Sequence, residues 1–258
     1  MIIIKIGLKF CLIYNKNMQK ELIKTRFKKS IKTYNDNAIV QKKMAINLVK
    51  YLGKNKYNSI VELGCGTGFI AEELTKNFNF SNYYAIDLVE DCKKYLSNIS
   101  KDINFICDDI EKVNLSEYNP DLIISNAALQ WIENLPEFIE KLMTNLNPKG
   151  QIAFTIFGEE NYKELDKIIP NKIKYYSLEN LKNIFKNYKI FTLKEEKNIL
   201  KFNTPKEVLY HIKYTGVNAI NSVSWTISDL KIFEKKYNEI CDKNITLTYH
   251  SIYVVLED

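Results

Sequence analysis

A chain of 258 residues with 46% hydrophobic residues is long enough to bury the core of one large α/β domain. Its five cysteines are odd in number and follow neither a Cys-x-x-Cys nor a Cys/His pattern, which excludes a disulfide framework and a zinc site and favours a reducing cytoplasm. The formal net charge of +6 reflects a Lys, Asn and Ile richness typical of AT-rich coding, so we expect no nucleic-acid partner.

The first fourteen residues are mostly apolar, but Lys5 and Lys9 interrupt them and no small-residue cleavage site follows. We therefore expect neither a signal peptide nor a membrane span. Met18 stands just before the first well-patterned helix, which suggests that residues 1–17 are a mis-called start or a frayed tail. Residues 1–22 as a whole are expected to be a tail outside the fold.

Helical spacing begins after this tail, and residues 23–52 are expected to form the N-terminal helices. Apolar side chains recur along one helix face: Ile23, Phe27, Ile31 and Tyr34. Lysines recur along a second face: Lys24, Lys28 and Lys32. The first face is expected to cover an apolar surface and the second to be basic.

From Asn58 onward, short apolar runs alternate with amphipathic stretches, which predicts a doubly wound parallel sheet with helices on both faces. Strands are expected near 59–63, 83–88, 104–107, 122–125 and 151–157. Helices are expected near 69–77, 90–97 and 136–146. Residues 58–157 should thus form a cofactor-binding core.

The C-terminal part, 158–258, continues the alternation and is expected to add a lid insertion and the rest of the sheet. We expect a helix at 178–188, a strand near 190–194, further helices after Thr204-Pro205 and after Ser228, and a last strand at 245–256. Thr204 is a predicted N-cap, and Gly216 a predicted stop of the same helix. No linker or repeat interrupts the chain, so 1–258 is expected to be a single domain.

A glycine-rich turn lies between the first strand and the next helix. Glycines let the backbone approach a ligand closely, and the helix N-terminus supplies unpaired N–H groups. The dinucleotide pattern G-x-G-x-x-G fails here, because Phe69 stands where its third glycine is needed. The alternative E-x-G-x-G-x-G resembles the first motif of class I methyltransferases, and it matches at Glu62, Gly64, Gly66 and Gly68. This resemblance implies S-adenosylmethionine as the cofactor.

Acidic residues follow the next two strands. Asp87, followed by Leu88, is placed to accept hydrogen bonds from both ribose hydroxyls, although a dinucleotide site would show a similar acid. Asp109-Ile110 resembles the pair that holds adenine through a carboxylate and a backbone N–H. Asp108 is the competing acid at that position.

After the fourth strand the chain reads Asn126-Ala127-Ala128-Leu129, and Asn126 and Ala127 are expected beside the cofactor. Methyltransferases that act on base amino groups usually carry N/D-P-P-Y/F there. The departure favours an oxygen or carbon acceptor over a base nitrogen.

Four segments are distinctive: the helix from Arg26 to Tyr34 with Ala38 and Gln41, then 125–131, then 208–218, and Thr246-Leu247-Thr248-Tyr249-His250. Together they resemble one family, the malonyl-[acyl-carrier protein] O-methyltransferases of biotin synthesis. The resemblance runs from about Arg26 to the C-terminus. It implies a Rossmann-like class I methyltransferase with a mostly parallel seven-stranded sheet and a small helical lid. It also implies methyl transfer to the free carboxylate of malonyl-acyl-carrier protein or malonyl-CoA.

A carboxylate is already ionised at neutral pH, so the reaction needs positioning rather than a general base. A cation should hold the acceptor, and the candidates are Arg26, Lys174 and Lys213. Arg26, the only arginine, is the first choice, whereas relatives often show an arginine near Lys174. Tyr34 is expected to close over the methyl donor, and Gln41 to bind its carboxylate. Lysines are expected to guide the acidic carrier protein: Lys24, Lys28, Lys29 and Lys32.

His211 and His250 are expected to make structural hydrogen bonds rather than to act as bases, and Trp131 and Phe157 to be core or pocket wall. No metal ligands are expected. The alternatives are another small-molecule carboxylate or hydroxyl O-methyltransferase, or a non-catalytic cofactor-binding assembly factor. We expect a cytoplasmic monomer that contacts neither membrane nor nucleic acid.

Overall fold

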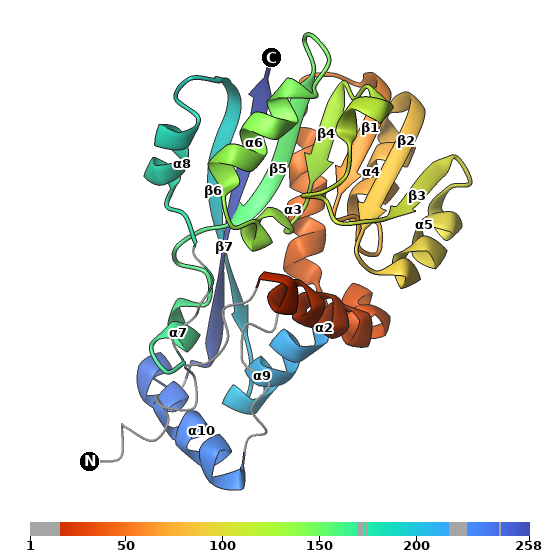
Figure 1. The fold of residues 1–258 in the computed structure, drawn as a ribbon. Helices are drawn as coiled ribbons and strands as arrows, with labels where there is room; N and C mark the ends of the chain where they lie inside the picture. Colours follow the sequence, from red (N-terminus) through yellow and green to blue (C-terminus); the bar gives the residue numbers. More distant parts are fainter. Residues whose placement is uncertain (1–15, 170–172, 174, 217–225, 243) are drawn as a thin grey trace.

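The computed structural model describes residues 16–169, 173, 175–216, 226–242 and 244–258. One seven-stranded sheet runs through them in the order β3-β2-β1-β4-β5-β7-β6 (Figure 1). The strands are β1 (Lys56–Leu63), β2 (Asn79–Asp87), β3 (Ile103–Cys107), β4 (Leu122–Ser125), β5 (Gln151–Phe157), β6 (Lys189–Lys201) and β7 (Thr246–Glu257). β1 to β5 pair in parallel, and β7 is antiparallel to both of its neighbours. The predicted α/β class and mostly parallel seven-stranded sheet are confirmed.

Helices cover both faces of the sheet (Figure 1). One face packs on α3 (Ile39–Lys50), α4 (Phe69–Asn77) and α5 (Lys93–Ile99), and the other on α6 (Leu135–Thr144) and α8 (Leu178–Ile184). Two buried apolar clusters, one on each face, form the core. Short 3-10 helices follow three strands: η2 (Glu90–Cys92), η3 (Leu115–Tyr118) and η4 (Leu129–Trp131). No helix in these described parts of the chain is long and apolar enough to cross a membrane.

The antiparallel pair of strands β6 and β7 extends past the end of β5. β5 pairs with β7 only between residues 251 and 257, whereas β6 stays paired with β7 as far as Thr246. The extension lies beside α7 (Lys163–Asp166), α9 (Pro205–Tyr214) and α10 (Ile227–Cys241), which form the predicted helical lid (Figure 1). The predicted strand at 190–194 was too short. The residues after Lys194 are mostly polar. They form an edge strand because they pair with β7, which is buried along almost its whole length.

Helix α2 (Lys16–Asn37) runs beneath the sheet beside α9 (Figure 1). The expectation that residues up to 22 form a tail was therefore wrong from Lys16 onward. No Gly or Pro interrupts 16–22, and the side chain of Lys20 is held by acids at the carboxyl end of the sheet. Residues 1–15 lie outside the described part.

Capping explains where the lid helices begin. The predicted N-cap Thr204 accepts a hydrogen bond from the Glu207 N–H at 3.3 Å, and Gly216 ends α9 with φ +68°. α10 begins earlier than its predicted start after Ser228. Its N-cap is Thr226, which forms a capping box with Asp229.

Candidate active site

The glycine turn forms one wall of a pocket at the carboxyl ends of β1 to β4. Gly64, Gly66 and Gly68 have φ values of +71°, +52° and +89°, a region that other residues rarely adopt. A Cβ on Gly64 would lie 2.6 Å from the Cβ of Ala128. Gly68 is the N-cap of α4, so the turn directs the unpaired N–H groups of that helix toward the pocket side.

Asp87 ties the end of β2 to this turn. Its Oδ2 accepts the Gly66 N–H at 2.9 Å, and its Oδ1 accepts the Val89 N–H at the same distance. Burial raises the pKa of Asp87, although these backbone donors favour the charged form. Asp87 and Leu88 both line the pocket.

Asp109 and Ile110 line the pocket after β3, whereas Asp108 is exposed outside the lining. Oδ2 of Asp109 lies 2.6 Å from the ammonium of Lys20, and Oδ1 accepts the Glu111 N–H at 3.1 Å. Burial alone would raise the pKa of Asp109, but Lys20 and the backbone donor hold it below its ordinary value.

Glu62 is the least exposed acid of the pocket, with 1% of its surface accessible. Burial raises its pKa to about 8, although Tyr83 donates a hydrogen bond to it at 2.7 Å. Burial thus favours the protonated form of this side chain at neutral pH.

Asn126 and Ala127 line the pocket where β4 ends. The Asn126 side chain donates to the Gln41 carbonyl at 3.0 Å and accepts from the Thr155 hydroxyl at 2.7 Å. The Gln41 side chain is 1% exposed and lies outside the pocket lining, where its amide interacts with the hydroxyl of Tyr249. The structure therefore places this predicted cofactor residue behind Asn126 rather than in the wall of the pocket.

One face of α2 closes the pocket. Its lining side chains follow helical spacing: Lys20, Ile23, Lys24, Phe27 and Tyr34. The ring of Tyr34 stacks on Phe69 with centroids 5.6 Å apart, and burial raises its pKa, so it stays a neutral phenol. Tyr34 thus lies where it was predicted, at the pocket.

Lys20 and Lys24 are pocket residues that the sequence reasoning did not place there. Both share a helix face with Ile23 and Phe27, so the i, i+3, i+4, i+7 spacing could have found them. Two of the predicted cations, Arg26 and Lys213, lie outside the pocket lining. Arg26 is half-buried on α2 outside the lining, with a pKa lowered by burial, and Lys213 is exposed on α9. Lys174 lies outside the described residues.

The end of α9 completes the pocket through Thr215 and Gly216. Behind it, His211 Nε2 lies 2.8 Å from the Tyr249 hydroxyl, which also accepts from the Tyr162 hydroxyl at 3.0 Å. Burial lowers the pKa of His211 to about 4, so it is neutral at physiological pH. The structural role predicted for His211 is confirmed.

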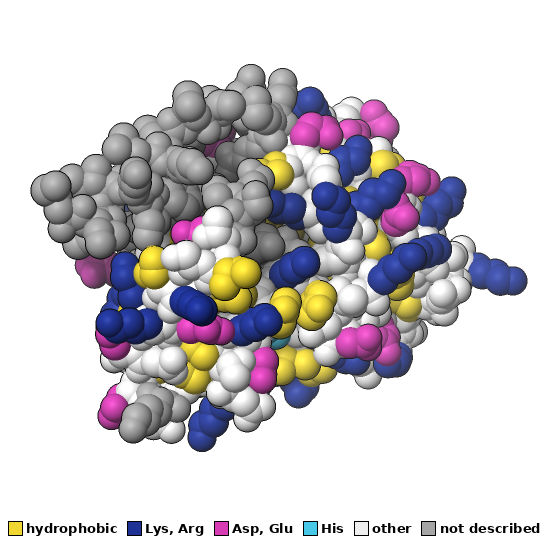
Figure 2. Space-filling model, turned by 90° about the horizontal axis from the view of Figure 1, so that it is seen from below, with side chains coloured by type: hydrophobic (Ala, Val, Ile, Leu, Met, Phe, Trp, Pro, Cys, Tyr) yellow, Lys and Arg dark blue, Asp and Glu magenta, His cyan; other side chains and the backbone are white. Residues whose placement is uncertain are grey.

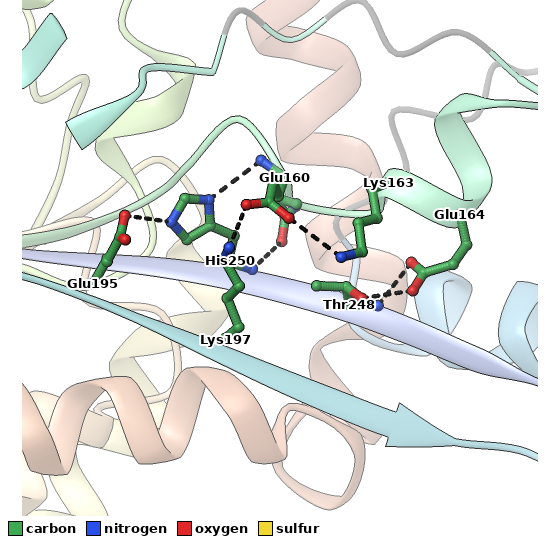
Figure 3. Close-up of polar contacts among 8 residues, drawn as sticks. Glu160, Lys163, Glu164, Glu195, Lys197, Thr248 and His250 are labelled. Atoms are coloured by element: carbon green, nitrogen blue, oxygen red, sulfur yellow. Dashed lines mark hydrogen bonds and ion pairs between the residues drawn. The ribbon is translucent and has the colours of Figure 1, made fainter. Parts of the chain in front are cut away.

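His250 holds the loop that follows β5 (Figure 3). Its Nδ1 accepts the Glu160 N–H at 3.2 Å, and its Nε2 lies 3.1 Å from Glu195. Farther along the loop, buried Glu164 accepts the Thr248 N–H at 2.9 Å. His250 therefore has the structural role predicted for it. We name these contacts of β7 with Glu160, Glu164 and Glu195 the loop clamp.

These residues fit S-adenosylmethionine. The cradle at Gly64 would be filled by a Cβ, and two buried acids, Asp87 and Asp109, lie at the carboxyl ends of the next two strands. Trp131 is pocket wall, and Phe157 is core. Among the described residues, no three His, Cys, Asp or Glu side chains are grouped to hold a metal ion.

Known proteins resemble this chain in sequence and in fold. Residues 61–154 match the family described as "Methyltransferase domain". A malonyl-[acyl-carrier protein] O-methyltransferase of Calditerrivibrio nitroreducens is 35% identical over 90% of this chain and 95% of the relative. One of Haemophilus influenzae is 32% identical over 93% of this chain and 95% of the relative. The N-methyltransferase NodS of Bradyrhizobium japonicum, solved with S-adenosyl-L-homocysteine, shares the fold at a TM-score of 0.53 and 12% identity, over 92% of this chain and 98% of NodS.

Proposed function

The chain belongs to the malonyl-[acyl-carrier protein] O-methyltransferase family, and on that premise we propose that it methylates the free carboxylate of malonyl-acyl-carrier protein, an early step of biotin synthesis. The chain is an S-adenosylmethionine-dependent methyltransferase. The cofactor supplies an electrophilic methyl group on a sulfonium. The observation that carries the proposal is the single pocket that joins the glycine turn with Asp87, Asp109 and a face of α2.

The cofactor side of the pocket offers a separate partner for each polar part of S-adenosylmethionine. We propose that Asp87 accepts the ribose hydroxyls, and that Asp109 and the Ile110 N–H hold adenine. Glu62 and the turn Gly64, Gly66 and Gly68 would cradle the methionine part, with Leu88, Asn126 and Ala127 beside it. Gln41 would bind the methionine carboxylate, which requires its buried amide to turn from Tyr249 toward the pocket beside Asn126.

The acceptor needs orientation and desolvation, because its carboxylate is ionised without help. Tyr34, packed against Phe69, would exclude water from the reacting atoms. For the cation that orients the acceptor we propose Arg26 and Lys174 as expected from the sequence, and we add Lys24 because it lines the pocket.

The decisive assay incubates the protein with methyl-labelled S-adenosylmethionine and malonyl-carrier protein, alongside malonyl-CoA, free malonate and RNA. Base-labile label on the malonyl thioesters is expected. Label on free malonate or RNA without label on the thioesters would support the alternative of another small-molecule or nucleic-acid acceptor. Cofactor binding with no transfer to any acceptor would support the non-catalytic assembly factor.

The cation is assigned by comparing Arg26→Ala with Lys24→Ala. The variant that removes the orienting charge should lower kcat at least about tenfold while cofactor affinity stays within about twofold. If both variants keep full turnover, neither residue orients the acceptor.

We further propose that the protein works as a cytoplasmic monomer without nucleic acid. Cell fractionation and sedimentation at working concentration test it. A membrane-bound pool or a stable dimer would overturn it.

A further inference from the structure

An exposed surface of lysine and tyrosine side chains borders the pocket. We call it the α9–α2 surface and define it as Lys29, Lys206, Tyr210, Lys213 and Tyr214. The two tyrosines are 42% and 39% exposed, and their rings stack at 6.1 Å with an interplanar angle of 17°. The ammonium of Lys206 lies 5.6 Å from the centre of the Tyr210 ring. Large aromatic side chains exposed together in this way are typical of interaction sites.

The surface is continuous with the edge of the pocket. Thr215 and Gly216 line the pocket and directly follow Tyr214. α9 and α2 touch at this point, because a Cβ on Gly216 would lie 2.4 Å from the Ser30 hydroxyl. Nearby, Thr33 donates to the Tyr214 carbonyl at 3.2 Å. A partner seated on the surface is therefore next to residues that line the site.

Basic side chains outnumber acidic ones on the two helices that form this surface. Residues 24–37 of α2 hold five basic residues and one acidic residue, Asp36. Lys24 lines the pocket and Lys28 pairs with Asp91 at 3.3 Å, which leaves Lys29 among the exposed lysines of α2. The acid on α9, Glu207, accepts the Asn203 N–H at 2.9 Å. Figure 2 shows this underside of the molecule, where Lys and Arg side chains lie among hydrophobic ones and several Asp and Glu side chains.

We infer that the α9–α2 surface docks the acidic helical face of an acyl-carrier protein, so that its thioester is presented at the Thr215–Gly216 edge of the pocket. The inference rests on the proposed function and adds the surface of contact. The lysines supply attraction and orientation toward an acidic partner, and the tyrosine pair supplies apolar contact area at low entropic cost.

The test compares two double charge reversals in the full chain. Lys29→Glu with Lys206→Glu alters the surface, and Lys56→Glu with Lys101→Glu is the matched control at the amino ends of β1 and β3. Binding of unloaded carrier protein is measured by titration calorimetry, methyl-ester formation with malonyl-carrier protein by label transfer, and cofactor affinity separately. The surface variant should weaken carrier binding and raise its KM at least about tenfold, with cofactor affinity unchanged. The control should change both by less than about twofold.

The remaining outcomes distinguish a failure of the docking inference from a failure of the proposed function. If the wild type forms ester and both double variants bind the carrier equally well, the docking surface is wrong and the function stands. If the wild type binds the carrier through these lysines but forms no ester, the function is wrong and the surface stands. A concentration-dependent dimer that the surface variant abolishes would assign the surface to a second copy of the chain and overturn the inference.

Discussion

The ammonium of Lys20 lies 2.6 Å from Oδ2 of Asp109, and both side chains line the pocket that would receive the cofactor. The same ammonium pairs with Glu111. Lys20 of α2 thus pairs with the same carboxylate that we assign to the adenine amine. Cofactor binding and this ion pair compete for one carboxylate.

We predict that Lys20→Met tightens cofactor binding about fivefold, because a partly exposed ion pair of about 1 kcal/mol no longer competes for Asp109. Titration calorimetry measures the change. Lys28→Met is the control, because its partner Asp91 lies outside the pocket lining. Weaker binding in Lys20→Met would mean that the lysine supports the cofactor instead.

The two adjacent acids after β3 give a second matched pair. Asp109→Asn should weaken cofactor binding at least about tenfold, since a charge-assisted hydrogen bond to the adenine amine contributes about 1.5–3 kcal/mol. Asp108→Asn should stay within about twofold, because this side chain is exposed and its Oδ1 only accepts the Asp109 N–H at 2.7 Å. Equal affinities in the two variants would remove Asp109 from the adenine site.

Stability should depend on pH through Glu62, whose pKa burial raises to about 8. The folded state keeps a proton that the unfolded chain releases above about pH 4.3, so this stabilising contribution is complete below that pH and is lost as pH rises through 8. Between about pH 5 and 8, wild type should lose stability relative to Glu62→Gln by up to about 1.4 kcal/mol per pH unit.

Urea unfolding of both proteins at three pH values in that window measures the difference. His211, whose pKa burial lowers to about 4, favours stability as pH rises toward 6.5, but it is present in both proteins and cancels. Parallel stability curves would show that Glu62 is ionised in the folded protein.

The glycine turn and its acids could be predicted from the sequence because each is a local pattern. Gly64, Gly66 and Gly68 have positive φ, and Asp87 is the last residue of its strand, so local spacing gives their positions. Strands β4 and β5 begin and end where apolar runs do, and their predicted bounds match.

The parts of the site and the fold that the sequence did not predict depend on contacts between distant segments. Lys20 belongs to the site only because α2 crosses the carboxyl ends of the strands 89 residues from Asp109 in sequence. The second half of β6 is polar and becomes a strand through its pairing with apolar β7. Gln41 shares a buried helix face with Met44, Ala45 and Leu48, so spacing predicts its burial but not its position behind Asn126. Spacing likewise places Lys20 on the Phe27 face of α2, but it does not tell which distant acids that face meets.

The loop clamp allows a comparison of a buried and an exposed acid four residues apart (Figure 3). Glu164 is 8% exposed and accepts hydrogen bonds from both the N–H and the hydroxyl of Thr248. Glu160, by contrast, pairs at the surface with Lys163 and Lys197.

Glu164→Leu should cost about 2–4 kcal/mol of stability, because two buried donors lose their acceptor. Glu160→Gln should cost no more than about 1 kcal/mol, since exposed ion pairs are weak. Thermal unfolding measures both. Because the clamp fixes the loop that carries Tyr162 against Tyr249, Glu164→Leu should also lower turnover, with cofactor affinity retained. Equal losses of stability in the two variants would show that burial does not distinguish these acids.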